Sequence, residues 1–563
     1  MRTLAKDNDV TVKAYAGTTG VLLAMNIEIP KRQGLLGFAI RRLRVSKNRR
    51  DWLAGGLHFP GIEHKPGEFA SSNVAPIQKF RWSDYTVYPD EDYEYTVHPV
   101  YGAPEKPEVT PGATARVRTE SLTQGEHRVI FNRAAAASQA FSRRFEGFIQ
   151  EYEAARKTKL PPPPMPSAAL SWLTRGLLDQ ILNFIGRAAD ANWALDIAIY
   201  EYELSAIIQA VQAARERGAM VRIVFHAKPD DEQTHVNLEN LRDFPELFRR
   251  ARVTHKICHH KFMVLSQKQG GTFEPQAVLC GSTNFTENGV YRQANVVHIL
   301  ESADTACQYA ALFEVLFRGD TVGATRKFIN KVNLLGDAGA VFAGFSPRTG
   351  LLDLKHFIEI VNSARRDVLF CTAFDLYDPL QQALLGQPHD PILRYGMQNT
   401  RSRITGVHAD RSADFAAAAM LSGGLEGWLK ESTVGQRGNI LIHTKIVIVD
   451  FTSDSPTVIS GSHNLSKPAS DSNDENYLIL RGVPNVADTY GCELMRLYDH
   501  YRFRFKLAED KKKQAEAGTP QPGTEAGQPK PLALCPDDTW TDDYFGMDTL
   551  KTFDRLRFAG EPV

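Results

Sequence analysis

Two short segments of the chain carry the same polar residues in the same order. Residues 443–450 read HTKIVIVD and residues 259–266 read HHKFMVLS, so each begins with His-x-Lys and continues with apolar residues. Further along the chain each segment is followed by Gly-Ser-x-Asn, which reads GSTN at 281–284 and GSHN at 461–464. Imidazole, ammonium, hydroxyl and amide groups in duplicate are suited to the cleavage of a phosphodiester.

In phosphodiester cleavage the two copies of each group can take different roles. One imidazole can attack phosphorus, while the other protonates the leaving oxygen and later activates water. The lysines and amides can stabilise charge on the non-bridging oxygens. No carboxylate cluster of the two-metal type stands beside either segment, so we predict a reaction without a metal or another cofactor. The predicted site residues are His259, Lys261, Ser282, Asn284, His443, Lys445, Ser462 and Asn464.

The apolar run after each His-x-Lys indicates a β-strand, in which side chains alternate between two faces. His443 and Lys445 would then share one face. The same alternation places His259 with Lys261 and turns His260 to the opposite face. Two such strands that face each other would bring both His/Lys pairs to one cleft.

The acid that ends the second segment has no counterpart in the first. Asp450 stands seven residues after His443, and Ser266 occupies the matching place in the first segment. An odd spacing directs the side chain away from the reacting groups. We therefore predict that Asp450 is a structural residue and takes no part in proton transfer.

Helices and strands alternate around both segments. Residues 177–202 and 354–376 each read as a helix followed by a strand, with apolar spacing near 3.6 and then a compact apolar run. Each unit closes with one more strand, NVVHIL at 295–300 or ENYLIL at 475–480. This alternation predicts an α/β fold, and a duplication of about 170 residues has the size of a domain. We expect two pseudo-symmetric α/β halves that share one active site.

The rest of the chain differs in composition from these halves. KFRWSDYTVYPDEDYEYTVHPVYG at 79–102 alternates aromatic or β-branched residues with polar ones. This pattern resembles the fibronectin type III or immunoglobulin-like sandwich, so an all-β sandwich-like domain is expected in front. The predicted division is an all-β domain at 1–105, a helical and Pro-rich connector at 106–169, α/β halves at 170–345 and 346–508, a disordered linker at 509–534, and a C-terminal tail docking on the body at 535–563.

The pattern H-x-K-x(4)-D followed by G-S-x-N, present twice, resembles the phospholipase D superfamily. The resemblance covers residues 170–508; the second segment matches completely and the first lacks only the terminal acid. Members use both motifs as one active site and react through a phosphohistidine intermediate. The resemblance therefore implies a metal-independent phosphodiesterase whose active site is complete within one chain, without an oligomer.

The resemblance also gives a role to the residue that opens each closing strand. In the superfamily this residue orients a histidine of the other half. Glu475 and Asn295 occupy the position here, and this acid and amide resemble the pair in the tyrosyl-DNA phosphodiesterase family. A carboxylate stabilises an imidazolium, whereas an amide only orients the ring. By this analogy Glu475 supports His259 as the nucleophile, and His443 is the general acid.

Composition gives little information about the substrate. Lys plus Arg equals Asp plus Glu, 66 each, so any attraction to nucleic acid or membrane must be local. The N-terminus lacks the apolar core of a signal peptide, no apolar run is long enough for a membrane span, and the six cysteines lack CxxC spacing. These features predict a cytoplasmic protein without a zinc site.

The segment RRLRVSKNRR at 41–50 could contact nucleic-acid phosphates or anionic lipid, or could be a solvated loop.

The motif GSTNFT at 281–286 resembles the endonuclease branch of the superfamily, so a nuclease acting on DNA or RNA is favoured. A phospholipase D or phosphatidyl transferase is the alternative, and a non-catalytic binding protein on the same scaffold is a third. For either substrate, the basic residues of segment 41–50 that could contact phosphates are Arg41, Arg42, Arg44, Lys47, Arg49 and Arg50.

Overall fold

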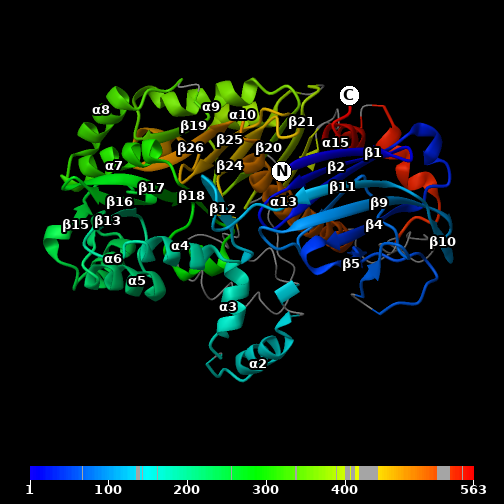
Figure 1. Cartoon of the computed structure of the whole chain (residues 1–563), viewed down its shortest axis with the longest axis horizontal. Coiled ribbons are helices and arrows are strands. Elements are labelled where there is room, and N and C mark those ends of the chain that lie inside the picture. Colours follow the sequence, from blue (N-terminus) through cyan, green and yellow to red (C-terminus); the bar gives the residue numbers. More distant parts are fainter. Residues whose placement is uncertain are drawn as a thin grey trace.

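The structure is a computed structural model in which an α/β body lies beside a β-rich part (Figure 1). In the described part of the chain, no helix has the length and apolar character needed to cross a bilayer. The structure describes the chain except for residues 66–67, 135–139, 142–143, 162, 255, 337–338, 388–389, 400–405, 408–412, 418–441, 517–532, 548 and 563.

Two antiparallel sheets form the β-rich part. One has the strand order β1-β2-β3-β8, and the other has the order β10-β9-β4-β5, with β11 also paired to β9. Along β9 the side chains of Tyr93, Tyr95 and Val97 are buried and their neighbours are not, because alternate residues face the core shared by the two sheets. The strands are β1 (Arg2–Asp7), β2 (Val10–Ala16), β3 (Val21–Ile27), β4 (Gly37–Arg44), β5 (Arg49–Trp52), β8 (Arg81–Asp84), β9 (Asp92–Ala103), β10 (Lys106–Val109) and β11 (Ala113–Arg118), with a separate short pair β6 (Ala54–Gly55) and β7 (Ala70–Ser71).

The prediction of a connector over residues 106–169 is wrong at its start. β10 and β11 lie within this range and pair with β9, so the β-rich part extends to Arg118. The next strand, β12 (His127–Phe131), pairs with β18 in the first α/β sheet, which therefore begins before residue 170. The later part of the range is helical, as expected, with α2 (Glu146–Lys157) and the start of α3 (Ser167–Thr174).

The α/β body contains two larger sheets with matching strand orders. The first has the order β12-β18-β17-β16-β13-β14-β15, and the second β19-β26-β25-β24-β20-β21-β23-β22. The first four strands of each order pair antiparallel, and parallel pairing joins β13-β14-β15 and β20-β21-β23. The strands that follow the two His-x-Lys motifs, β16 and β24, occupy the same place in the two orders.

The strands of the first large sheet are β13 (Trp193–Ile199), β14 (Met220–His226), β15 (Arg249–Arg252), β16 (Lys261–Gln269), β17 (Thr272–Gly281) and β18 (Val296–Leu300), beside β12. Those of the second are β19 (Val341–Ser346), β20 (Asp367–Thr372), β21 (Leu393–Gln398), β22 (Gly406–Val407), β23 (Ala413–Ala417), β24 (Ile446–Val449), β25 (Thr457–Gly461) and β26 (Glu475–Arg481).

Helices cover both sheets, and the longest of them, α13, contacts strands of the β-rich part and of both large sheets (Figure 1). One core cluster accordingly contains residues from all three sources, including Tyr15, Phe262 and Ile446. The helices of the body are α4 (Leu177–Gly186), α5 (Ser205–Glu216), α6 (Glu232–Asn240), α7 (Ala303–Phe317), α8 (Val322–Val332), α9 (Leu352–Asn362), α10 (Asp378–Leu385), α12 (Lys467–Asp471) and α13 (Pro484–Glu516).

The end of the chain returns to the body. The predicted disordered linker at 509–534 is wrong in its first residues, because α13 continues to Glu516; residues 517–532 lie outside the described part. The C-terminal segment forms η7 (Asp538–Thr541), α14 (Asp542–Phe545) and α15 (Leu550–Ala559). The hydroxyl of Tyr15 donates to the carbonyl of Phe558 at 2.7 Å, and α15 also contacts β21. This segment therefore packs against both the β-rich part and the second large sheet.

The basic segment at 41–50 forms the hairpin of β4 and β5, where several of its charges are already paired. Arg42 contacts Asp84 at 2.7 Å, and Arg44 contacts Glu91 at 2.6 Å. Arg49 pairs with Asp51 within the hairpin. The guanidinium of Arg41 lies over the ring of Trp52. These contacts weaken the prediction of an anion-binding surface, since three of its six cations already have carboxylate partners.

Candidate active site

The two His-x-Lys motifs lie where the α/β halves meet. The backbone N–H of His259 donates to the carbonyl of Asp474 at 2.8 Å, and that of His443 donates to the carbonyl of Ala294 at 2.9 Å. Each motif histidine is therefore bound through its backbone to the opposite half. The regular strands begin only at Lys261 and Ile446, so the histidines precede the strands in which the sequence analysis placed them.

The two imidazoles face each other across this boundary. The ring centroids of His259 and His443 are 6.4 Å apart, and the ring planes meet at 77°. Both residues are about 5% exposed. This separation allows both rings to contact one phosphate group, as attack on phosphorus and protonation of the leaving oxygen require.

Each imidazole is held through its Nδ1 atom by the residue predicted for that role. His259 Nδ1 lies 2.7 Å from Glu475 Oε2, and His443 Nδ1 lies 3.0 Å from Asn295 Oδ1. The carbonyl oxygen of Ser282 is a second neighbour of His443 Nδ1, also at 3.0 Å. All three partners are oxygens, so Nδ1 carries the proton in the neutral ring and Nε2 has the free lone pair.

The serines of the Gly-Ser-x-Asn motifs support these oxygens. Ser282 Oγ donates to Asn295 Oδ1 at 2.8 Å, and Ser462 Oγ donates to Glu475 Oε2 at 2.6 Å. Each hydroxyl also accepts from the backbone N–H of the residue after its partner, at 3.1 Å from Val296 and 3.0 Å from Asn476. Both serines are fully buried. They fix the groups that orient the histidines.

The glycine in each of these motifs permits a close approach of two backbones. A Cβ atom at Gly281 would lie 2.2 Å from the carbonyl oxygen of Val296, and one at Gly461 would lie 2.4 Å from that of Asn476. Only glycine leaves room for these contacts. The approach places the serine beside the start of the closing strand, where Asn295 and Glu475 stand.

The lysines occupy equivalent positions in the two halves. Lys261 Nζ donates to the carbonyl of His259 at 2.9 Å, and Lys445 Nζ donates to the carbonyl of His443 at 2.7 Å. Burial lowers the pKa of Lys261 to about 8 and the pKa of Lys445 well below its usual range, to which Lys261 contributes. Two ammonium groups in one buried site create a strong preference for an anion.

Burial and the charges of the two lysines also change the pKa values of the histidines. Burial lowers the pKa of His259 well below its usual range, and the two lysines lower it further. Burial and the same lysines also lower the pKa of His443. Burial raises the pKa of Glu475 to about 8, against the opposite effect of Lys261. Without a bound anion both imidazoles are therefore neutral at pH 7, and His259 is in the form required of a nucleophile.

Asp450 and His260 are turned away from the reacting groups, as strand alternation predicts. Asp450 Oδ1 accepts the backbone N–H of Arg365 at 2.9 Å and that of Arg366 at 2.7 Å, at the start of β20. His260 is buried against Phe262. In this arrangement the Asp450 carboxylate joins two backbone segments of the second half.

Asn284 and Asn464 follow β17 and β25 at the same offset, three residues after the glycine that ends each strand. The Nδ2 group of Asn284 donates to Glu201 Oε2. The sequence analysis missed Glu201, whose signal was an acidic residue two positions after the end of the apolar strand β13. The Asn284–Glu201 contact brings a further carboxylate to the predicted phosphate-binding groups.

Aromatic rings accompany both histidines. The ring of Tyr200 lies 5.2 Å from that of His259, and the ring of Phe374 lies 6.1 Å from that of His443, between centroids. Each aromatic ring also approaches the lysine of the same half, at 5.3 Å for Lys261 and 5.8 Å for Lys445. Tyr200 and Phe374 are half-buried, so each presents some ring surface beside the histidines.

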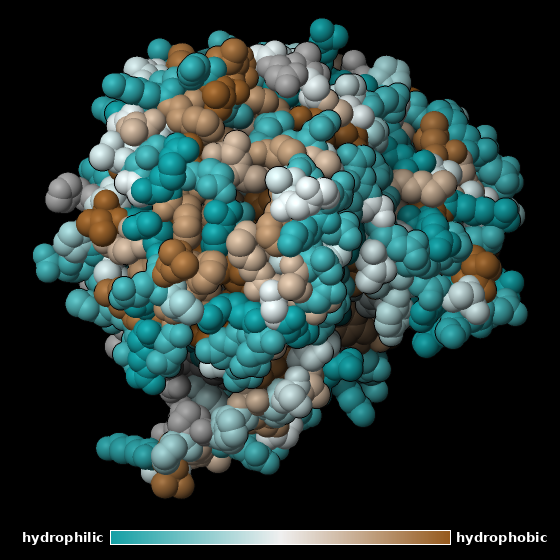
Figure 2. Space-filling view, turned by 60° about the vertical axis from the view of Figure 1, so that its left-hand side comes forward, coloured by the Kyte–Doolittle hydropathy of each residue, from teal (hydrophilic) through white to brown (hydrophobic). Residues whose placement is uncertain are grey.

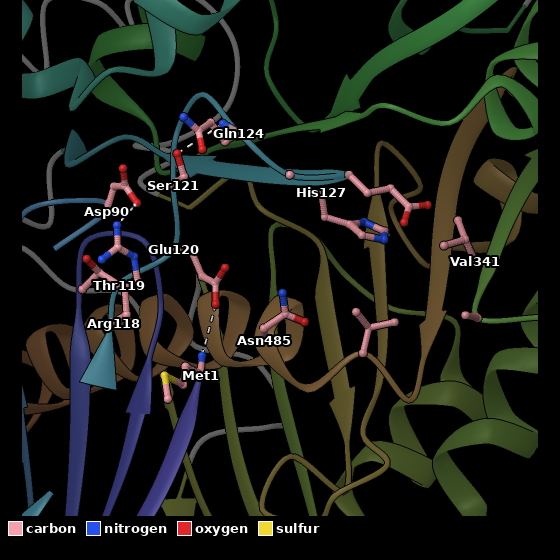
Figure 3. Close-up of a pocket in the computed structure, with 14 residues that line it drawn as sticks. Met1, Asp90, Arg118, Thr119, Glu120, Ser121, Gln124, His127, Val341 and Asn485 are labelled. Carbon is pink, nitrogen blue, oxygen red and sulfur yellow. Dashed lines mark hydrogen bonds and ion pairs between the residues drawn. The ribbon is translucent and has the colours of Figure 1, made fainter. Parts of the chain in front are cut away.

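Another pocket, of about 580 Å³, lies between the β-rich part and the body and contains neither motif (Figure 3). The amine of Met1 contacts Glu120 at 3.1 Å, and Arg118 contacts Asp90 at 2.8 Å. Four of the charged groups that line this pocket thus pair with one another. It lacks the facing imidazoles and lysines of the motif site, which remains the better candidate for catalysis.

Comparison with known families agrees with the motifs. Residues 182–317 match the family model described as cardiolipin synthase, PLD-like domain, and this segment holds the first His-x-Lys and Gly-Ser-x-Asn motifs. The resemblance to the phospholipase D superfamily is therefore confirmed, and with it the prediction of an enzyme that acts on phosphodiesters. No curated protein matches the chain.

Several solved structures resemble the chain at low sequence identity. Phosphatidylserine synthase from Haemophilus influenzae Rd KW20 has 12% identity and a TM-score of 0.40, over 61% of this chain and 92% of that one. Yeast tyrosyl-DNA phosphodiesterase has 12% identity and a TM-score of 0.31, over 53% and 86%. Polyphosphate kinase from Porphyromonas gingivalis has 14% identity and a TM-score of 0.39, over 57% and 48%, so the chain spans about half of that enzyme.

Proposed function

We propose that the chain is a metal-independent phosphodiesterase that reacts through a phosphohistidine and acts on nucleic acid. The observation that carries the proposal is the pair of facing imidazoles, His259 and His443, with ring centroids 6.4 Å apart and each Nδ1 held by an oxygen of the opposite half. In this proposal the sheet that runs from β12 to β15 and the sheet that runs from β19 to β22, each with its helices, form pseudo-symmetric halves of one enzyme, which the matching strand orders support.

In the first step, His259 Nε2 attacks phosphorus and the bond to the leaving oxygen breaks. In its ionised form Glu475 accepts a hydrogen bond from Nδ1–H and stabilises the positive charge that develops on the ring, whereas the amide of Asn295 cannot do this for His443. His443 gives a proton from Nε2 to the leaving oxygen. This assigns the nucleophile to His259 and the general acid to His443.

In the second step, His443 Nε2 takes a proton from water, and the resulting hydroxide displaces His259 from phosphorus. The site returns to its starting protonation, and the products are a phosphomonoester and an alcohol. Lys261, Lys445 and the amides of Asn284 and Asn464 bind the non-bridging oxygens throughout. A bound phosphodiester anion offsets part of the lysine charge, which raises the pKa of His443 and allows it to hold the proton it must donate.

Nucleic acid is the favoured substrate because of the groups that border the histidines. Tyr200 and Phe374 place partly exposed rings beside the two histidines, and aromatic rings stack with bases at sites that bind single strands. On the face seen in Figure 2, hydrophobic residues occur in small groups between hydrophilic ones, without one continuous apolar area. Both features suit a polar polymer better than a lipid surface.

The alternative function is transfer or hydrolysis of a phospholipid headgroup. It is supported by the description of the matching family model, which names cardiolipin synthase. A non-catalytic scaffold is disfavoured, because the lysine and the serine of each motif make matching contacts in the two halves.

The experiment offers the purified full chain, in excess EDTA, four substrates in parallel: single-stranded DNA, RNA, plasmid and phosphatidylcholine. We expect cleavage of at least one nucleic acid, and loss of that cleavage in both His259→Ala and His443→Ala. Release of choline without nucleic-acid cleavage would replace the favoured substrate with the alternative. Absence of both reactions in the wild type would contradict the phosphodiesterase proposal.

A further inference from the structure

Glu201 is a carboxylate next to the phosphate-binding groups that the proposed mechanism does not use. Its Oε2 atom accepts a hydrogen bond from Nδ2 of Asn284. It also interacts electrostatically with both catalytic lysines, Lys261 and Lys445. The proposed anion-binding site therefore also contains a carboxylate that interacts with its two lysines.

The carboxylate is present in one half only. Glu201 stands two residues after Ile199, the last residue of β13, whereas the second half has Phe374 two residues after Thr372, the last residue of β20. Because Phe374 has no charge, Glu201 changes the total charge of the shared site rather than repeating a feature of the fold.

We propose that Glu201 sets the charge of the phosphate site so that it accepts a monoanionic phosphodiester and disfavours a dianionic phosphomonoester. This inference rests on the proposed function. A bound phosphate anion raises the pKa of both lysines, so in the complex they supply two positive charges, and an ionised Glu201 offsets one of them. A diester carries one negative charge, which neutralises the remaining lysine charge. A monoester carries a second negative charge, which Glu201 repels. The same repulsion promotes release of the monoester product.

The neighbours of Glu201 support its ionisation above neutral pH. Burial raises the pKa of Glu201 to about 7; Lys261 and Lys445 oppose this rise, and Glu203 adds to it. Among the described residues, Glu475 is the other carboxylate that acts on both lysines, and it bonds to His259. At pH 8 most of the Glu201 carboxyl is therefore negative, and charge discrimination is expected there.

The test compares two small ligands at pH 8, dimethyl phosphate as the monoanion and methyl phosphate as the dianion. Dissociation constants are measured by calorimetry with the full chain, as wild type, Glu201→Gln and Glu203→Gln. Glutamine keeps an oxygen that can accept from Asn284 but removes the charge. We expect Glu201→Gln to bind methyl phosphate at least about tenfold more tightly, and dimethyl phosphate with a much smaller change. Glu203→Gln, an exposed change in the same segment, lowers the pKa of Glu201 and should leave the ratio of the two constants nearly unaltered, because Glu201 is already mostly ionised at pH 8.

A second variant separates charge from positioning. Glu201→Ala removes both the charge and the hydrogen bond to Asn284, and we expect the same shift in favour of methyl phosphate. An unchanged ratio in both Glu201 variants would overturn the inference and leave the proposed function intact. A wild-type protein that binds neither ligand would overturn the proposed function and, with it, this inference.

Discussion

His259 Nδ1 and Glu475 Oε2 meet at 2.7 Å across the boundary between the two α/β halves. The corresponding contact on the other side joins His443 to the amide of Asn295 at 3.0 Å. The two histidines therefore differ in the charge of the residue that holds Nδ1, although a serine hydroxyl supports that residue in both halves. This difference determines the roles that we expect from each ring.

The first prediction concerns the two supporting residues. Glu475→Gln should lower kcat far more than Asn295→Ala, because only the carboxylate stabilises an imidazolium. Loss of such a carboxylate can cost up to about four orders of magnitude in a hydrolase triad. Loss of an orienting group costs about one to two orders. Steady-state kcat for the two folded variants gives the comparison, and equal losses would contradict the assignment.

The second prediction separates nucleophile from general acid. His259→Ala should form no covalent phosphoenzyme with any substrate. His443→Ala should accumulate the adduct with substrates that have good leaving groups, because it can still attack phosphorus but cannot activate water efficiently. Mass spectrometry of acid-quenched samples locates the phosphate. An adduct on His443 in the wild type would reverse the two roles.

The site could be predicted from the sequence because its main groups belong to short, repeated motifs. The spacing of His-x-Lys and Gly-Ser-x-Asn is local, and the chain carries two copies that can be compared. Strand alternation was sufficient to predict that the Asp450 side chain points away from the reacting groups. The prediction held even though His443 itself precedes the regular strand. Glu201 could not be found in this way, because its place beside Asn284 depends on the packing of β13 against the loop after β17.

The boundaries of the β-rich part and of the α/β halves were also hard to predict, because they too depend on contacts between segments that are distant in the sequence. β10 and β11 are short, and only their pairing with β9 shows that they belong to the β-rich part. The ion pairs of the basic hairpin at 41–50 could not be predicted, because two of the acids that pair with it, Asp84 and Glu91, stand far along the chain. Such contacts depend on tertiary structure, which residue spacing alone does not report.

The third prediction tests the structural role of Asp450. Asp450→Ser, which copies the residue of the first half, should reduce the free energy of unfolding by about 1–3 kcal/mol, since the backbone N–H groups of Arg365 and Arg366 lose their acceptor. It should leave kcat nearly unchanged. Asp450→Asn is the matched control, because it keeps an acceptor oxygen. A folded Asp450→Ser protein as inactive as Glu475→Gln would place the acid in the chemistry.

The fourth prediction concerns metal ions. Activity of the full chain should persist in excess EDTA, because Lys261 and Lys445 supply the positive charge that a metal would otherwise provide. Rates are measured before and after dialysis against the chelator. Complete loss of activity that magnesium or manganese restores would be incompatible with the proposed mechanism.

The last prediction is a pH dependence of substrate binding. The pKa of Lys261 is lowered to about 8 by burial, so the side chain is charged below this pH and loses its charge above it. The pKa of Glu475 is raised to about 8, so this carboxyl gains negative charge over the same range. Both changes weaken the attraction for a phosphate anion, and KM for a diester should rise as the pH increases from 7 to 9. Lys261→Arg keeps its charge in this range and should show a smaller rise than the wild type. A KM independent of pH in the wild type, with kcat measured in parallel, would show that the charge of Lys261 does not control binding.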